Sequence, residues 1–542
     1  MLAPLRTNAN RQAVVKSATV PAPVKGWDAA TALAAMDKLA AIQLTNWFPQ
    51  PGWVEVRRGY QQHARNLGTS STPVQSLMAW NGPAAAKMFA AAGGVIYDVT
   101  ASGAGTSAVT SLSENRWQSA NMTTSAGAFL FIVNGTDAPR HYNGTTWATP
   151  TITGTGYTAT DSINVNVHKK RIWLVQKDST KAFYLGTEAI AGTATAFELG
   201  SNFNLGGYLV AMATWTLDAG SGPDDYAVFI SSKGQLAVYQ GTDPASADTW
   251  ALVGVFDLAP PIGRRCFIKF GTAPAIITMS GVLHLALNLK EEKANLTASA
   301  LTGKILNAMN RAARSYSDNF GWQLCVYPKG TRLYLNVPTS ENATAVQYVM
   351  NTITGAWCDQ NNHNANCWLE FEGDLYFAAN NGKVYRADTG SADIDTPILA
   401  VGQTAYQAFF TAGNIKRYSM VQPLVTTEGS SRPSVGISAD FQETSALSTL
   451  SGATQETSLW GEAVWGEDLW GGAEIFVADW TSTPAMGRFG SVKFQANTGT
   501  EADVSTWGSA RWAQDGWGST GIGEQTMQIN GFVVLAEVGG HL

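Results

Sequence analysis

Short apolar runs separated by Gly, Asn and Asp cover most of the chain from about residue 53 to residue 390. Segments 87–100, 226–242 and 375–390 share one pattern: an apolar run, a turn centred on glycine, and a second run that contains tyrosine. This pattern is typical of a β-hairpin, because glycine supplies the positive φ that a tight turn needs.

Less regular copies of the hairpin pattern occupy four further segments: 129–147, 171–187, 275–287 and 331–357. Hairpins that recur at irregular spacings of roughly 30 to 60 residues are typical of the blades of a β-propeller. We therefore expect a propeller-like repeat domain of six or seven blades. A pair of β-sandwiches is the structural alternative.

Two segments break the β pattern. Residues 29–48 are rich in alanine with apolar positions at i, i+3 and i+4, which predicts one short N-terminal helix ended by Pro49 and Pro51. Residues 291–316 show an amphipathic helical pattern, which predicts a helical insertion between two blades.

The pattern changes again after residue 390. Apolar and polar residues alternate, as in a half-buried antiparallel sheet, in four runs at 414–427, 432–442, 487–497 and 524–538. The predicted organisation is mainly β, with an extended arm at 1–25, a β-propeller-like domain at 26–390 and a C-terminal antiparallel β-sandwich domain at 391–542.

Two stretches of the C-terminal region, 458–472 and 505–519, place a tryptophan at every fifth position, which fits neither helix nor strand. Their tryptophans correspond at a constant offset of 47 residues: Trp460, Trp465 and Trp470 with Trp507, Trp512 and Trp517. We expect two loops side by side, with indoles packed on each other or on a neighbouring subunit. The alternative is that these rings stack on host glycan.

The amino-acid composition adds an expectation about assembly. Of the 542 residues only 14% are charged, whereas 45% are hydrophobic and 19 are tryptophan. A surface so poor in charge suggests burial against other subunits. The net charge of −6 argues against a groove that grips nucleic acid through its phosphates.

The same composition bears on the place of synthesis. The four cysteines, Cys266, Cys325, Cys358 and Cys367, are too few for a disulfide scaffold and are interpreted as reduced thiols of a protein made in the cytoplasm. No apolar stretch reaches the roughly 18 residues of a membrane span, and the N-terminus has no signal-peptide pattern.

Candidate chemistry is sparse. Cys358, His363 and Cys367 resemble a metal cluster, but a fourth ligand is missing and the spacing matches no common zinc pattern. Residues 246–254, SADTWALVG, resemble the Asp-box turn of sialidase-type propellers but lack its glycine. We therefore expect no catalytic, cofactor-binding or metal-binding residues, and no cofactor.

Other motifs are interpreted as structural. Asn-Gly-Thr at 134–136 and 143–145 has the form of a glycosylation acceptor but is expected to be a turn. The basic groups at Arg57-Arg58, Arg264-Arg265 and 168–171 are expected in solvated loops or subunit contacts.

The N-terminal region carries a family resemblance. Pro21 and Pro23 before Gly26, the Ala-rich segment, the run 46–49 (NWFP) and Arg58-Gly59 resemble the opening of tail nozzle proteins, the tail tubular protein B type, of short-tailed bacteriophages (podoviruses). Further likeness lies in 224–244 and 256–266 and continues weakly to about residue 390.

The resemblance implies a structural virion protein of the phage tail rather than an enzyme. It implies a homohexameric ring at the distal end of the short tail, below the adaptor ring of the portal complex, which is a conduit and gate for DNA ejection and a platform for tail fibres or spikes. Genomic DNA would pass through the lumen without sequence-specific binding. The alternative functions are a glycan-recognising propeller or fibre-like tail protein and, from the enzyme class, a tail-associated glycan hydrolase.

Overall fold

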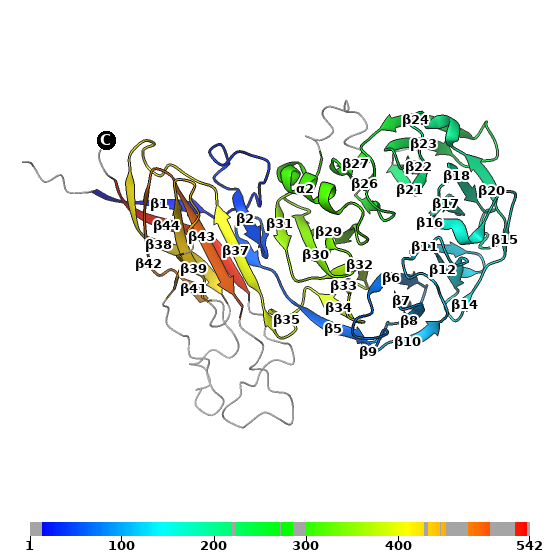
Figure 1. Cartoon of the computed structure of the whole chain (residues 1–542), viewed down its shortest axis with the longest axis horizontal. Helices are drawn as coiled ribbons and strands as arrows, with labels where there is room; N and C mark the ends of the chain where they lie inside the picture. Colours follow the sequence, from blue (N-terminus) through cyan, green and yellow to red (C-terminus); the bar gives the residue numbers. More distant parts are fainter. Residues whose placement is uncertain are drawn as a thin grey trace, which may run out of the picture. The chain divides into compact units, whose positions relative to one another are not determined.

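The computed structural model describes residues 14–218, 223–271, 273–285, 300–427, 432–444, 446–450, 475–498 and 526–538. The chain divides into two compact units: Gly59–Thr389 form one, and Met1–Arg58 together with Gly390–Leu542 form the other. Both are built almost entirely from antiparallel β-sheet (Figure 1).

The unit formed by residues 59–389 is a β-propeller. Five of its blades are separate sheets. In order they are β6 (Val74–Asn81), β7 (Ala86–Ala92), β8 (Val95–Asp98) and β10 (Thr106–Val109); β11 (Gln118–Thr124), β12 (Gly127–Val133), β13 (Arg140–Tyr142) and β14 (Trp147–Ala148); β16 (Ser162–His168), β17 (Arg171–Gln176), β18 (Lys181–Tyr184) and β20 (Thr195–Glu198); β21 (Leu209–Asp218), β22 (Pro223–Ser231), β23 (Gln235–Gly241) and β24 (Trp250–Asp257); and β25 (Phe267–Phe270), β26 (Ala273–Thr278) and β27 (Gly281–His284).

Two further antiparallel sheets complete the ring among the described residues. They are β28 (Gln323–Tyr327), β29 (Arg332–Ser340), β30 (Thr344–Asn351) and β31 (Trp357–Gln360), and then β32 (Ala365–Phe371), β33 (Asp374–Ala379), β34 (Val384–Ala387) and β5 (Tyr60–Arg65). The innermost strands contact one another in the order β6, β11, β16, β21, β25, β28 and β32, and β32 contacts β6 (Figure 1). Because β5 precedes the first blade in sequence but pairs with β34, the two ends of the unit close the ring.

Short pairs connect these blades. They are β9 (Gly103–Ala104), which pairs in parallel with β5, and β15 (Ile152–Thr153), which pairs in parallel with β19 (Gly192–Thr193), together with the 3-10 turns η1 (Ala159–Asp161), η2 (Gly200–Asn202) and η3 (Gly303–Ile305). Each of the seven segments predicted to be a hairpin contains a pair of antiparallel strands. In chain order the pairs are β7–β8, β12–β13, β17–β18, β22–β23, β26–β27, β29–β30 and β33–β34. The predicted propeller-like fold is confirmed.

Apolar clusters between neighbouring blades form the core. Between β16–β20 and β21–β24, for example, Trp173 stacks on Trp250 with ring centroids 5.7 Å apart, and Trp250 stacks on Tyr239 at 5.8 Å. Trp250 belongs to the segment 246–254 that resembles an Asp-box turn. Its indole is buried in this cluster, where it packs blade against blade.

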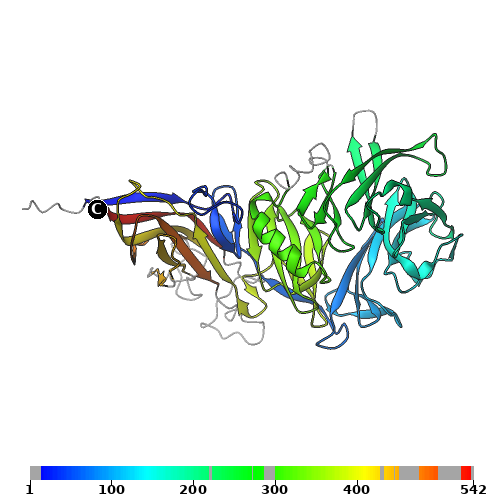
Figure 2. The same ribbon diagram turned by 45° about the horizontal axis from the view of Figure 1, so that its top comes forward.

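One α-helix, α2 (Leu306–Tyr316), lies among the described residues and contacts β29 and β27 (Figure 2). It buries an apolar stripe, Ala308, Met309, Ala312 and Ala313, which is the face that the amphipathic pattern predicted. The helical insertion expected at 291–316 is confirmed for 306–316, whereas residues 286–299 lie outside the described ranges.

The second unit is a β-sandwich. One sheet joins β1 (Val14–Pro21), β44 (Met527–Val538), β38 (Lys416–Thr427), β41 (Ile475–Val477), β42 (Thr481–Gly487), β4 (Val54–Val56) and β3 (Trp47–Pro49). The other joins β2 (Ala41–Thr45), β37 (Leu399–Thr404), β43 (Gly490–Asn497), β39 (Ser434–Ala439) and β40 (Ser448–Thr449), and β35 (Ala392–Asp393) pairs with β36 (Thr396–Pro397). Phe494 joins the two layers, with its ring 5.3 Å from Trp47 and 5.2 Å from Phe532.

The predicted C-terminal sandwich is therefore confirmed, but the assignment of residues 26–58 to the propeller is wrong. These residues belong to the sandwich unit, because β1 pairs with β44, β2 with β37, and β4 with β44. The arm expected at 1–25 is extended at 14–21, where β44 holds it as a strand.

The predicted N-terminal helix over 29–48 is also wrong. The backbone forms turns up to residue 40, and then β2 and β3. The helix propensity of alanine is a weak preference that tertiary packing can override. Here burial of the apolar end of the segment in the sandwich core stabilises the strands more, because Leu44, Trp47 and Phe48 are fully buried. Asp28 also holds the turn, since its carboxylate accepts the backbone N–H groups of Ala30 and Thr31.

The basic pair Arg57-Arg58 was expected in a solvated loop or a subunit contact, and for Arg57 the solvated loop is wrong. Its guanidinium is buried and forms two hydrogen bonds with the carboxylate of Asp393, at 2.8 and 2.7 Å. The tryptophan stretches 458–472 and 505–519 lie outside the described residues, so their packing stays a prediction.

Candidate functional site

A cavity opens where several inner strands of the propeller begin. Its volume is about 370 Å³, and its lining comes from the segments before β11, β25 and β28, from the turn that follows β12 and from the residue that follows β17. The lining residues used below are Glu114, Arg116, Lys177, Arg264, Arg265 and Phe320. A second cavity of about 250 Å³ adjoins it and shares Lys177, Gly263 and Arg264.

Arg265 reaches across the centre of the ring. It precedes β25, yet its Nη2 donates to the backbone oxygen of Gln75 at 3.0 Å and of Trp117 at 3.1 Å, and to the hydroxyl of Ser76 at 2.7 Å. Ser76 in turn donates to the backbone oxygen of Asn115 at 2.7 Å. One guanidinium thereby links the fifth blade to the first and second, and forms the floor of the cavity.

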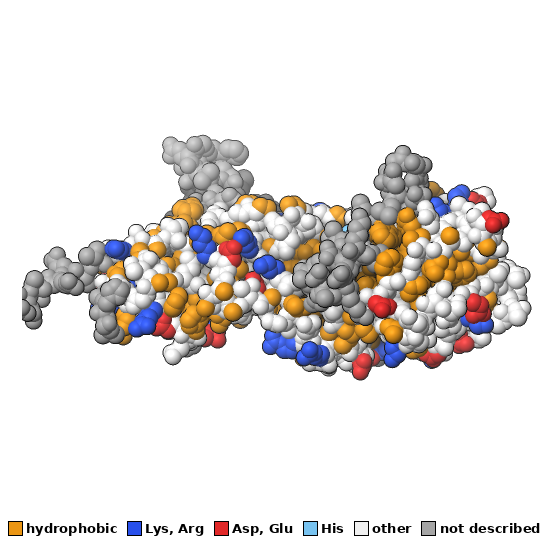
Figure 3. Space-filling view, turned by 90° about the horizontal axis from the view of Figure 1, so that it is seen from above, with side chains coloured by type: hydrophobic (Ala, Val, Ile, Leu, Met, Phe, Trp, Pro, Cys, Tyr) orange, Lys and Arg blue, Asp and Glu red, His pale blue; other side chains and the backbone are white. Residues whose placement is uncertain are grey.

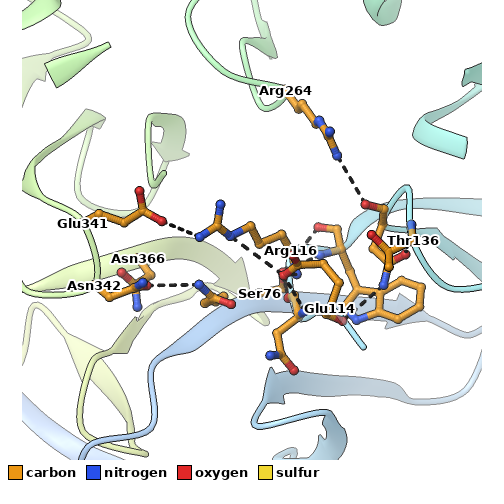
Figure 4. Close-up of polar contacts among 12 residues, drawn as sticks. Ser76, Glu114, Arg116, Thr136, Arg264, Glu341, Asn342 and Asn366 are labelled. Atoms are coloured by element: carbon orange, nitrogen blue, oxygen red, sulfur yellow. Dashed lines mark hydrogen bonds and ion pairs between the residues drawn. The ribbon is translucent and has the colours of Figure 1, made fainter. Parts of the chain in front are cut away.

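Arg116 lies on the wall of the cavity and is charge-compensated. It forms an ion pair with Glu341 and lies 3.8 Å from the carboxylate of Glu114 (Figure 4). Its guanidinium also lies over the ring of Phe320, 4.4 Å from the centroid, and Arg265 lies over the same ring at 5.0 Å. These cation–π contacts hold both guanidinium groups in place.

Arg264 points into the cavity from the loop before β25. Its Nη1 donates to the backbone oxygen of Asn134 at 3.2 Å (Figure 4). Gly135 permits this approach, because it has a φ of +79° and a Cβ there would lie 3.2 Å from Nη1 of Arg264. Burial lowers the pKa of Arg264 and of Arg265 from its ordinary value, which reflects the cost of removing a charged guanidinium from water.

The cavity therefore collects cations, whereas the sequence interpretation placed Arg264-Arg265 in a solvated loop or a subunit contact. Both side chains are partly buried within the propeller. Arg116, Lys177 and Phe320 were not recognised from the sequence. No spacing signal could have found them, because the ring closure brings together residues about 200 positions apart.

The basic run 168–171 was likewise expected in a solvated loop or a subunit contact, and for His168 the solvated loop is wrong. Its ring is buried edge-on against Trp250, with centroids 5.7 Å apart. Burial lowers its pKa to about 4, so the imidazole is neutral in the folded chain near pH 7.

The suspected cluster of Cys358, His363 and Cys367 does not assemble as a metal site. His363 packs among aromatic rings, 5.4 Å from Phe377 and 5.5 Å from Trp368 between ring centroids. Within the described ranges, no three His, Cys, Asp or Glu side chains are grouped to hold a metal ion.

The cysteines are buried and without a disulfide among the described residues. Burial raises the pKa of Cys266 and Cys325 to about 12 and that of Cys367 to about 11. These three thiols are therefore protonated near neutral pH, and a protonated thiol is a poor nucleophile and metal ligand.

Both Asn-Gly-Thr motifs form turns, as predicted. Asn134 Oδ1 accepts the N–H groups of Thr136 and Asp137, and Asn143 Oδ1 accepts those of Thr145 and Thr146. The first of these turns belongs to the cavity wall, so it has a role there that the sequence did not reveal.

Comparisons with known proteins do not assign a family. No protein-family model and no curated protein matches the chain. Solved structures with some likeness include BBS1N in complex with ARL6DN (TM-score 0.38, 11% identity, 61% of this chain and 98% of that one). Others are Raptor of Chaetomium thermophilum (0.36, 9%, 61% and 29%) and YCF48 of Cyanidioschyzon merolae (0.33, 8%, 62% and 98%). At this level the likeness carries no argument about function.

Among the helices of the described residues, none has the length and apolar character needed to cross a membrane.

Proposed function

We propose that the protein is a structural subunit of a short phage tail, a tail nozzle that forms a homohexameric ring and conducts DNA. In this proposal the ring contacts the tail adaptor of the portal complex and carries fibres or spikes, and the chain is not an enzyme. The family is proposed from the sequence resemblance at residues 21–59. The structural observation that supports it is an apolar edge suited to contact between copies.

That edge is strand β24, the outermost strand of the fourth blade. Ala251, Leu252 and Val253 are exposed in succession, with 43% of Leu252 and 51% of Val253 accessible. Natural edge strands usually carry charges or prolines that prevent pairing with another chain. Figure 3 shows hydrophobic side chains gathered over this side of the propeller.

The sandwich unit has exposed apolar side chains of its own. Phe476 is 62% exposed and Met486 71%, and Trp480 is also exposed. Contact with another protein chain would remove such side chains from water, which favours association. Each unit thus has apolar side chains that contact with a second copy of the chain would bury, and this supports a ring of many subunits.

Substitution in β24 tests the proposal. We expect Leu252→Asp to leave the propeller folded, because the side chain is exposed, but to prevent ring formation by placing a charge in the contact. Ile353→Asp is the matched control: Ile353 is 69% exposed in the turn after β30 and lies away from β24 in sequence and sheet. Native mass spectrometry reads the assembly state of both variants. Assembly of Leu252→Asp as in the parent would contradict the assigned contact.

The alternative function, recognition of host glycan, depends on the tryptophan stretches 458–472 and 505–519. They lie outside the described residues, and no observation in the described part of the chain favours it.

A further inference from the structure

The cation-lined cavity of the propeller has no place in the proposed mechanical role. Partly buried charges are costly unless another charge or a ligand compensates them. The carboxylates around the cavity are Glu114, Glu341 and Asp318, with Asp178 in the adjoining cavity. Arg116 engages two of these, Glu114 and Glu341.

Three cations remain. Arg264, Arg265 and Lys177 form no ion pair with any carboxylate of the described residues, although all three line the cavity. Arg264 and Arg265 are half-buried, whereas Lys177 lies at the exposed rim. Arg264 and Arg265 donate hydrogen bonds to backbone oxygens and to one serine hydroxyl, and Arg265 also to the thiol of Cys367, and all of these acceptors are uncharged. Around the two adjoining cavities the four carboxylates equal in number the four cations, Arg116 included, but only Arg116 contacts a carboxylate within ion-pair distance. The other three cations are therefore left without a direct ionic partner in the described part of the chain.

The rest of the lining is polar and suited to a small ligand. Gln118, Ser317 and Asn319 supply amide and hydroxyl groups, and Phe320 supplies an apolar wall. The cavity of about 370 Å³ falls within the range of about 300 to 1,000 Å³ that is usual for small-molecule sites. A double-stranded nucleic acid would instead need an open basic groove.

We propose that this cavity binds the oxyanion of a small ligand, a phosphate monoester or a carboxylate, held by Arg264 and Lys177. Arg265 is a positioning residue, because its contacts with Gln75, Ser76 and Trp117 fix the floor rather than leave its guanidinium free to move. Guanidinium groups bind phosphate and carboxylate with paired, charge-assisted hydrogen bonds. The proposal is independent of whether the protein forms a tail ring.

Titration calorimetry of the full chain tests it with five probes: inorganic phosphate, glycerol 3-phosphate, glucuronate, and the neutral compounds glycerol and glucose. We expect saturable binding of at least one anion, one per chain, and none of either neutral compound. Preference for glycerol 3-phosphate assigns a phosphate monoester, and preference for glucuronate assigns a carboxylate. Absence of saturable binding of all three anions up to about 10 mM would overturn the proposal.

Variants locate the site. Arg264→Gln and Lys177→Gln each remove one charge, and each is expected to weaken binding about 10-fold or more, as loss of a charged hydrogen bond does. Lys181→Gln is the matched control, because Lys181 pairs with Glu198 at 2.7 Å on β18, away from the cavity lining. Unchanged affinity in both cavity variants, or equal loss in the control, would overturn the assignment.

Circular dichroism of each variant shows whether weaker ligand binding is caused by unfolding of the protein. Binding only to a 20-nucleotide single strand, with none of the small anions bound, would also overturn the proposal, since it would indicate a polyanion surface in place of a small-molecule site.

Discussion

Substitution of the buried ion pair between Arg57 and Asp393 tests the division of the chain into two units. This ion pair joins the end of the N-terminal segment to the start of the C-terminal region, 336 positions later in the chain. The two side chains are only 2% and 3% exposed. Arg57 also donates to Asn46 Oδ1 at 2.9 Å and to the backbone oxygen of Arg58 at 3.0 Å.

Asp393→Ala removes the carboxylate and leaves a guanidinium buried without its counter-charge. Breaking a buried pair in this way costs about 3–5 kcal/mol of unfolding free energy. The double variant Arg57→Met with Asp393→Leu removes both charges and is expected to recover most of that loss, because neither charge then has to be desolvated. Lys25→Ala is the control. It breaks the exposed Lys25–Asp37 pair, which should cost less than about 1 kcal/mol.

Hydrogen exchange measured by mass spectrometry shows which strands are destabilised in Asp393→Ala. Peptides from β38 and β44 should exchange about 100-fold faster or more in Asp393→Ala, since about 2.7 kcal/mol already corresponds to that factor. Peptides from β12 and β17 in the propeller should be unchanged. Equal exchange in parent and variant, or faster exchange confined to the propeller, would refute the assignment of residues 41–58 to the sandwich.

Three further outcomes are expected. Because burial holds the pKa of His168 at about 4, against 6.5 when unfolded, the unfolded chain binds the proton first as the pH falls. The unfolding free energy should therefore decrease between pH 6.5 and 4, by up to about 3 kcal/mol, and His168→Gln should flatten this part of the urea-midpoint profile. Trp173→Ala should lower the unfolding free energy by about 3–5 kcal/mol in urea titrations and change the near-ultraviolet circular dichroism, because it empties the stacked cluster with Trp250; an unchanged spectrum would contradict that packing. Gly241→Ala should cost about 1–3 kcal/mol, because the φ of +145° disfavours other residues and a Cβ would lie 1.9 Å from the backbone oxygen of Thr249; a thermal midpoint equal to that of the parent would count against the β23–β24 geometry.

The hairpins could be predicted from the sequence because their signal is local. Segments such as 226–242 contain two apolar runs and the glycine turn that joins them, so pattern and structure span the same residues. The strands that line the centre of the ring carry a weaker signal. β11, for example, alternates exposed and partly buried residues with a single buried position, Met122, and was not recognised.

The errors have a common physical origin in contacts between distant parts of the chain. Residues 29–48 have a helical composition, but pairing of β2 with β37 and burial of Trp47 and Phe48 decide their conformation. The cavity could not be predicted for the same reason: Arg116 and Lys177 are unremarkable in sequence, Arg264 stood out only as part of a basic pair, and only closure of the ring brings the three together.

The mass of the purified assembly, measured by native mass spectrometry together with electron micrographs of the particles, tests the proposed function most directly. The proposal predicts closed six-fold rings with a central hole and a mass six times the 57.6 kDa of one chain. A stable trimer, or a monomer that persists when the adaptor ring is supplied, would contradict it.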